Sequence, residues 1–313
     1  RSAKVLMCLF LPLFLLISSQ LVGFLYLFQI AIEINDDDVW TKSFRREEEY
    51  PMTIVLLRSI GNALPPRHQI SQTLDNLNFT LTYEKSFPNV IKHWVLNRFV
   101  EKEVERQVVE LLDQYRQNYT IIPFDLKEYS ELKLNFDLFE PGGQRDYIHS
   151  SKYKKEKFVL FEQAVESAKT LYVCNVNGAR NTMIDIGLTM GVTWILPWDG
   201  NCFVTDDAFL NLQKVLAKEK GKYFVTPAHR VVGENSQVLH PEYRPARSEE
   251  PMISFRNDAV GRFHPLLWYG RRNKVEMLLR LKVPGIWDNA YKFAKWENEK
   301  YVPPLLSPLP DIG

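Results

Sequence analysis

The strongest constraint on the fold is an alternation between short apolar runs rich in β-formers and longer segments with helical spacing. Residues 52–57 (MTIVLL) form the first such run, and residues 69–83 then carry an apolar residue every three or four positions. A short apolar run favours a strand, whereas a period near 3.6 favours a helix. The alternation continues with predicted strands at 93–100, 119–124, 194–197 and 223–227, and predicted helices at 101–115, 158–168, 178–190, 206–218 and 271–281.

This alternation predicts an α/β fold with a mostly parallel central sheet and helices on both faces. In such sheets the ligand binds beyond the carboxyl ends of the strands. The candidate binding residues are therefore the polar residues that directly follow an apolar run. They are Arg58 and Asn62 after the first strand, Asn97 and Arg98 at the end of the second, and Asp199 with Asn201 after WILPW.

An uncharged apolar segment at residues 5–32 precedes the folded part. Roughly 20 apolar residues cross a bilayer, so we expect a transmembrane signal anchor. Lys4 precedes the segment and an acidic triplet at 36–38 follows it, which places the N-terminus in the cytosol and the domain in the ER or Golgi lumen or outside the cell. A cleaved signal peptide is the alternative. The glycosylation sequons at Asn78 and Asn118 agree with the lumenal placement.

The expected organisation has five parts. They are a cytosolic end (1–4), the anchor (5–32), a charged stem (33–50), the α/β domain (51–288) and a Pro-rich tail or linker (289–313). The chain has 39 Lys and Arg against 38 Asp and Glu, so no global positive charge favours a nucleic-acid partner.

Two short motifs carry the chemistry. Asp199 and Asn201 present a carboxylate and an amide oxygen two residues apart, which suits Mg²⁺ or Mn²⁺ carrying a diphosphate. The alternative for these residues is a tight turn. Upstream, Arg180 lies near the start of a predicted helix, where backbone amides and a guanidinium can hold phosphate. Ordinary helix capping by Asn175 or Asn177 is the alternative there.

Taken together, the two motifs form NGARNTMIDIGLTMGVTWILPWDGNCFVTDDAFLNLQKVL, which resembles the central signature of family-2-like, A-type-fold glycosyltransferases. The blocks HWVLNRFVEKEVERQVVELL and MISFRNDAVGRFHPLLWYGRRNKVEMLLRL fit the same order, so the resemblance covers roughly residues 52–287. It implies a nucleotide-sugar donor and a glycan acceptor. It also implies that Asp199 binds the metal with help from Asn201, and that Arg180 and Asn181 hold the diphosphate, while Asn97 meets the base or ribose.

The chain departs from that family at two places. Asn201 stands where the family has a second Asp, and Asn273 with Lys274 stands where it has Glu-Asp and its general base. Glu276 is a substitute base, or else a salt-bridged helix residue, and Asp258 is a second substitute. The missing base leaves open a non-catalytic carbohydrate-binding or scaffolding protein, and the donor residues would also suit a nucleotide-sugar phosphotransferase. In an oxidising lumen, Cys174 and Cys202 could pair.

Overall fold

The computed structural model describes residues 24–27, 52–63, 69–134, 165–245, 249–267 and 274–285. The strands are β1 (Phe24–Leu27), β2 (Ile54–Gly61), β3 (Val90–Asn97), β4 (Asn118–Ile122), β5 (Trp194–Asp199), β6 (Cys202–Phe203), β7 (Tyr223–Val231) and β8 (Glu249–Arg256). The helices are α2 (Ile70–Tyr83), α3 (Lys102–Gln114), α4 (Leu126–Glu131), α7 (Ser167–Val173), α8 (Val176–Thr189), α9 (Asp206–Leu216) and α10 (Val275–Arg280), with a 3₁₀ turn at Asn235–Leu239.

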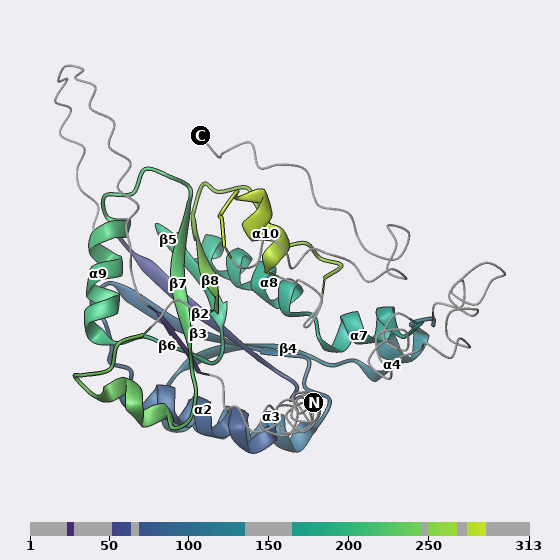
Figure 1. Cartoon of the computed structure of the whole chain (residues 1–313). Helices are drawn as coiled ribbons and strands as arrows, with labels where there is room; N and C mark the ends of the chain where they lie inside the picture. The colour runs from purple at the N-terminus through teal and green to yellow at the C-terminus, as the bar shows by residue number, and fades with distance from the viewer. Residues whose placement is uncertain are drawn as a thin grey trace, which may run out of the picture.

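All described strands belong to one mixed sheet in the order β4-β3-β2-β5-β8-β7-β1-β6 (Figure 1). Strands β4, β3, β2 and β5 are parallel, as predicted. The prediction of a mostly parallel sheet is corrected at β8, which pairs antiparallel with both β5 and β7. The alternation predicts no strand at 249–256, where the segment begins with two Glu and a Pro and its apolar run is short.

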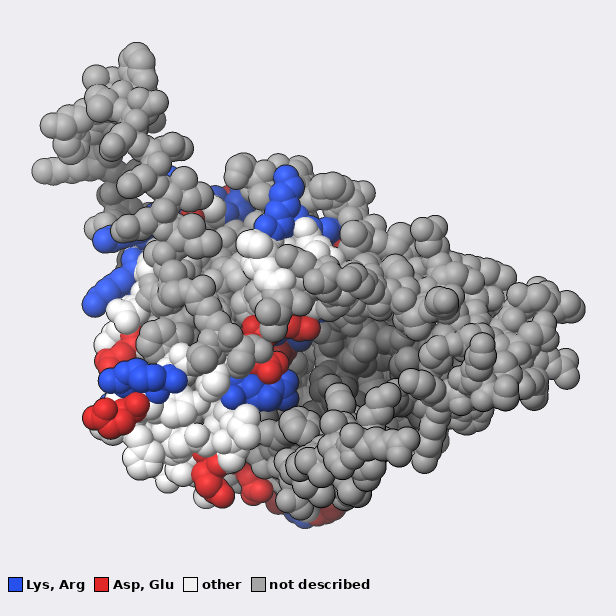
Figure 2. Space-filling view, in the orientation of Figure 1, with Lys and Arg blue, Asp and Glu red and all other residues white. Residues whose placement is uncertain are grey.

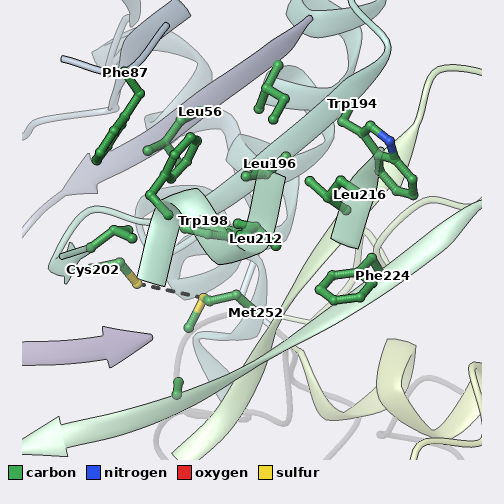
Figure 3. Packing of buried hydrophobic residues seen from close by; sticks show 14 residues of the cluster. Leu56, Phe87, Trp194, Leu196, Trp198, Cys202, Leu212, Leu216, Phe224 and Met252 are labelled. Carbon is green, nitrogen blue, oxygen red and sulfur yellow. Dashed lines mark hydrogen bonds between the residues drawn. The ribbon is translucent and has the colours of Figure 1, made fainter. Parts of the chain in front are cut away.

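Helices cover both faces of the sheet, as the alternation predicted. Even-numbered residues of β2 and β5, such as Leu56 and Trp198, pack in a core that includes residues of α9. Odd-numbered residues, such as Val55 and Ile195, pack against α8 and α10. Helices α2 and α3 cover β2 and β3 on the α9 side. Figure 1 shows α2 and α3 below the strands and α8 and α10 above them, and Figure 3 shows the α9-side core around Trp198.

The N-terminal prediction falls mostly outside the described residues. Residues 24–27 form strand β1, which pairs with β7 and β6, so a helix does not extend over these four positions. The rest of 5–32, the stem at 33–50 and the tail at 289–313 lie outside the described residues. Within the described ranges, no helix combines the length and apolar character that a membrane crossing requires. The transmembrane anchor stays a prediction.

Charged side chains of both signs are interspersed on the face drawn in Figure 2. Over the described part of that face, Lys and Arg alternate with Asp and Glu, and neither sign forms a broad patch. This distribution agrees with the near-zero formal charge of +1. Local clusters of charged side chains are therefore the candidates for a functional site.

Candidate functional site

The candidate site lies where the order of the strands reverses. The chain runs from β2 to β3 and β4 on one side, and then returns to place β5 on the other side of β2. Ligands of open α/β sheets bind at this switch point, outside the carboxyl ends of the strands. The register puts Ser59 beside Asp199 and Gly61 beside Asn97. Three predicted strand ends therefore meet at one edge of the sheet.

A tight turn at 199–201 ends strand β5. The turn passes so close to β2 that a Cβ on Gly200 would overlap the carbonyl oxygen of Ser59 and lie 3.1 Å from Cγ1 of Ile60. Glycine is therefore required by space at this position. Asn201 is partly buried in the turn. The turn that the sequence left as an alternative is present, and it fixes the position of the Asp199 carboxylate.

The Asp199 carboxylate contacts two cationic side chains. Nη2 of Arg180 donates to its Oδ1 at 2.5 Å, and Nζ of Lys274 lies 3.4 Å from its Oδ2. The side chains of Arg180 and Lys274 are each 5% exposed, whereas that of Asp199 is 25% exposed. The cluster is thus a pair of buried cations joined by one carboxylate that reaches solvent. We call Arg180, Asp199 and Lys274 the charged triad.

The charge state of the triad follows from these contacts. Burial raises the pKa of the Asp199 carboxyl, but the charges of Arg180 and Lys274 and their hydrogen bonds outweigh burial, so the pKa lies well below its ordinary value. The carboxyl is therefore ionised at neutral pH. Two cations and one carboxylate leave an excess of positive charge at the edge of the sheet, and such a site attracts anions.

The same arrangement does not fit the divalent cation expected at Asp199 and Asn201. Both oxygens of the carboxylate already face a cation. Mg²⁺ and related ions need several oxygen ligands, usually including carboxylates that are free to coordinate. Within the described ranges, no group of three His, Cys, Asp or Glu side chains could hold a metal.

Helix α8 begins at the site and holds Arg180 in place. Asn175 caps the helix by accepting a 2.7 Å hydrogen bond from the Gly178 amide, as the capping alternative predicted. Oδ1 of Asn177 accepts a 2.8 Å bond from Nη1 of Arg180, and its Nδ2 donates to the carbonyl of His264. These bonds fix the guanidinium of Arg180 at the edge of the sheet. Capping and anion binding are therefore compatible roles of one helix start.

Asn181 has a different position from the one implied for a phosphate ligand. Its Nδ2 donates to the carbonyl of Phe263 at 3.0 Å, and its Oδ1 accepts from the amide of Phe263 at 2.9 Å. Both ends of the amide are used to pin the loop after β8 to helix α8. The ring of Phe263 lies 5.3 Å from the guanidinium carbon of Arg180. Asn181 thus holds in place the loop that carries Phe263 beside Arg180.

Asn62 and Asn97 connect the strand ends. Nδ2 of Asn62 donates to the carbonyl of Arg98 at 2.8 Å, and its Oδ1 accepts from the Val100 amide at 2.8 Å, so Asn62 ties the end of β2 to the end of β3. Nδ2 of Asn97 donates to the carbonyl of Asn175 at 3.1 Å. Oδ1 of Asn97 is buried and has no hydrogen-bond partner in the described structure. Of these two residues, Asn97 keeps an acceptor for a ligand.

Arg58 does not belong to this edge. Its side chain is 1% exposed and lies on the α2 and α9 face, because even positions of β2 point there. Its Nη1 and Nη2 donate to the Glu84 carboxylate at 3.0 and 2.5 Å, and Lys92 lies 2.9 Å from the same carboxylate. Arg58 is thus the partner of a buried carboxylate, and its position gives the prediction of a cofactor ligand no support. Pattern alone could not tell which face of β2 it occupies.

The carboxylates considered as general bases lie elsewhere. Glu276 is fully buried, and its two oxygens accept from Arg280 at 2.7 and 3.0 Å. This geometry matches the salt-bridged alternative. Asp258 follows β8 and pairs with Arg256, which lies beside Trp194 at the opposite end of β5 from Asp199. Asn273 lies outside the described residues.

Lys274 is the residue that the sequence analysis undervalued. It was considered only as a replacement for an acidic base, yet it immediately precedes helix α10 and faces Asp199. A cation at a helix N-terminus is electrostatically unfavourable unless it has a partner. The predicted helix at 271–281 contains Lys274, so only the observed start of α10 at Val275 shows that this lysine lies at a helix N-terminus.

The suggested bridge between Cys174 and Cys202 is absent. Both residues are free thiols. Cys202 lies in the α9-side core with its Sγ 3.7 Å from Sδ of Met252 (Figure 3). Cys174 follows helix α7, next to the start of α8. The motifs that contain Cys174 and Cys202 lie near the same edge of the sheet, but the two sulfurs are not bonded to each other.

No protein-family model, curated protein or solved structure matches this chain. A functional assignment therefore has to be carried by the fold and by the chemistry of the site.

Proposed function

We propose that the protein is a membrane-anchored glycosyltransferase that moves a sugar from a nucleotide-sugar donor to a glycan acceptor. The observation that carries this proposal is the charged triad at the switch point of an α/β sheet. Arg180 comes from α8, Asp199 from β5 and Lys274 from the residue before α10. The resemblance of these segments to A-type glycosyltransferases supports the choice of a nucleotide sugar over other phosphorylated ligands.

The chemistry of such a transfer suits an excess of positive charge. The bond between the sugar C1 and the phosphate oxygen breaks, and its electron pair leaves with the nucleoside diphosphate. A hydroxyl oxygen of the acceptor forms the new bond to C1, and its proton is released to solvent. Negative charge grows on the leaving diphosphate, and preorganised cations at that position lower the barrier. Arg180 and Lys274 are placed to do this.

A non-catalytic carbohydrate-binding or scaffolding protein is the second candidate. It is favoured by the positions of Glu276 and Asp258, since one is buried in an ion pair and the other lies at the opposite end of β5. Both carboxylates are held in ion pairs, so neither is a free general base in this arrangement. Such a protein would bind a nucleotide sugar or glycan without releasing the nucleoside diphosphate.

The test that separates the two candidates is release of nucleoside diphosphate by the purified full chain. The protein would be incubated with uridine, guanosine, adenosine and cytidine diphosphate sugars, with and without a mixture of glycan acceptors. If the protein is a transferase, we expect it to release nucleoside diphosphate from one class of donor, and to do so only when an acceptor is present. Binding of a donor without any release would favour the second candidate, and absence of both binding and release would reject the proposed function.

The membrane placement is part of the same proposal. The exposed side chains of Asn78 and Asn118 are positioned to carry glycans if the domain faces the lumen. We expect the protein expressed in eukaryotic cells to lose mass on treatment with an N-glycosidase and to stay in the membrane fraction at high pH. Loss of the mass shift only in the double variant Asn78→Gln/Asn118→Gln assigns the glycans. An unglycosylated, extractable protein would contradict this placement.

A further inference from the structure

We infer that the diphosphate is held directly by Arg180 and Lys274 and that its binding requires no divalent cation. This inference rests on the proposed function and deepens it, because it names the groups that would replace the metal. It departs from the expectation that Asp199 and Asn201 coordinate Mg²⁺ or Mn²⁺. In this site the Asp199 carboxylate is a positioning group for two cations.

The first argument is the sign of the local charge. A divalent cation at Asp199 would have to sit beside the guanidinium of Arg180, 2.5 Å from Oδ1, and the ammonium of Lys274, 3.4 Å from Oδ2. Like charges at such separations repel strongly where burial excludes water. A diphosphate at the same edge instead meets an unbalanced positive charge. The balance of charge therefore favours the anion over the metal.

The second argument is that both cations are held in place before a ligand arrives. Arg180 is fixed by Asn177 at 2.8 Å and by Asp199, and Nζ of Lys274 donates to the carbonyl of Glu250 at 3.1 Å. A guanidinium carries five N–H donors, and the contacts described for Arg180 use one on each terminal nitrogen. The remaining donors can bond phosphate oxygens, and the contacts that hold the guanidinium lower the entropy lost on binding.

A third, independent observation points to a ligand at this edge. Asn97 is 3% exposed, and its Oδ1 has no hydrogen-bond partner in the described structure. A buried acceptor without a donor is costly, and such atoms are uncommon unless a ligand or water completes them. Its Nδ2 is already bonded to the carbonyl of Asn175, the capping residue of α8. Asn97 can therefore accept a hydroxyl or N–H of the nucleoside while α8 faces the phosphates.

The experiment measures binding of nucleoside diphosphates and inorganic pyrophosphate to the purified full chain by titration calorimetry. Each titration is done once with excess EDTA and once with Mn²⁺. We expect one nucleoside diphosphate to bind in EDTA with a dissociation constant within about threefold of that in Mn²⁺, a difference below 1 kcal/mol. Lys274→Met should weaken this binding at least about tenfold, since it removes a charge-assisted hydrogen bond.

Matched variants give the inference a second readout. Lys222→Met removes a lysine that pairs with Asp258 at the opposite edge, so binding should not change. Asp199→Asn should bind the diphosphate in EDTA at least as tightly as the natural protein, because it removes a negative charge while keeping an oxygen beside the cations. If Asp199 were instead a ligand of a metal ion that binds the diphosphate, the Asp199→Asn variant would lose binding. Thermal unfolding of every variant identifies any that fail to fold.

The outcomes distinguish this inference from the proposed function. Binding that appears only with Mn²⁺ and is lost in Asp199→Asn overturns the inference and leaves the transferase proposal standing. Equal binding by Lys274→Met and the natural protein also overturns it. Absence of binding to every nucleotide and to pyrophosphate, with or without Mn²⁺, overturns both.

Discussion

Gly200 is the residue on which the geometry of the site depends most directly. A Cβ at this position would overlap the backbone of Ser59, and neither backbone can move without disturbing the paired ends of β2 and β5. We predict that Gly200→Ala lowers the free energy of unfolding by about 1–3 kcal/mol, the usual cost of overpacking. The measurement is denaturant unfolding of the full chain followed by circular dichroism.

Gly61 provides the matched control for that substitution. It ends the neighbouring strand, and the closest atom to an added Cβ is the carbonyl oxygen of Asn97 at 3.6 Å, an ordinary contact. Gly61→Ala should therefore leave stability nearly unchanged. Equal destabilisation by both substitutions would show that the close approach at Ser59 is not the cause.

The two described cysteines differ in burial, although burial raises the pKa of both thiols. Burial raises the pKa of the Cys202 thiol to about 12, and the nearby Asp199 carboxylate adds to the effect. Cys174 is only partly buried. We predict that iodoacetamide at pH 8 labels Cys174 in the native protein much faster than Cys202, because the thiolate is the reactive form. Peptide mass spectrometry measures both rates. After denaturation without reductant, failure of both thiols to react would instead indicate a bridge.

At the scale of elements, a buried ion cluster joins β2, β3 and the end of α2. The Glu84 carboxylate binds Arg58 and Lys92 and accepts a 3.0 Å bond from the Val204 amide. Because the Arg58 and Glu84 side chains are each 1% exposed, Glu84→Gln leaves a buried guanidinium without its counter-charge. We predict a loss of about 3 kcal/mol in unfolding free energy.

A surface pair is the control for the ion cluster. Glu103 bonds to Arg106 on the exposed face of α3, where water screens the charges. Glu103→Gln should change the unfolding midpoint very little in the same assay. If the two substitutions had similar effects, the buried cluster would not be the link that holds α2 to the sheet.

The sequence predicted elements better than it predicted side-chain roles. Helix 69–83 and helix 206–218 are found at Ile70–Tyr83 and Asp206–Leu216, because apolar spacing is a local signal, reinforced in the second helix by the Thr205 cap. Strand β8 was missed. It is the next strand after β7 but pairs on its other side with β5, which lies far back in the chain, and it is antiparallel to both. Residues that depend on which face a strand buries, such as Arg58, could not be placed from local pattern.

At the scale of the whole molecule, the sheet makes one site from segments far apart in the chain. Asp199, Arg180 and Asn97 were predicted at strand or helix ends, and parallel pairing brings those ends to a common edge. Lys274 reaches the same edge from the other side of β8, through a part of the fold that the sequence did not specify. The motif order therefore indicated which segments meet at this edge, and the fold was needed to show that two cations face Asp199 there.

The pKa of Asp199 in the charged triad makes the free energy of unfolding of the domain depend on pH. The folded-state pKa of Asp199 lies below its unfolded value of about 3.9, so the folded state keeps the carboxylate where the unfolded chain binds a proton. Its stabilising contribution is complete above about pH 5 and declines as the pH falls through the unfolded and then the folded pKa. Stability should therefore fall in acid partly because of this one group.

We predict that Asp199→Asn lowers the unfolding free energy by roughly 1–3 kcal/mol at pH 7, and that the difference from the natural protein shrinks towards pH 3. Urea unfolding at pH 7, 5, 4 and 3 measures the difference. Asp258→Asn is the control, since Asp258 is 49% exposed and water screens its pair with Arg256, so its effect should be smaller at every pH. A difference that stayed constant between pH 7 and pH 3 would mean that Arg180 and Lys274 do not hold the Asp199 carboxylate in the folded protein.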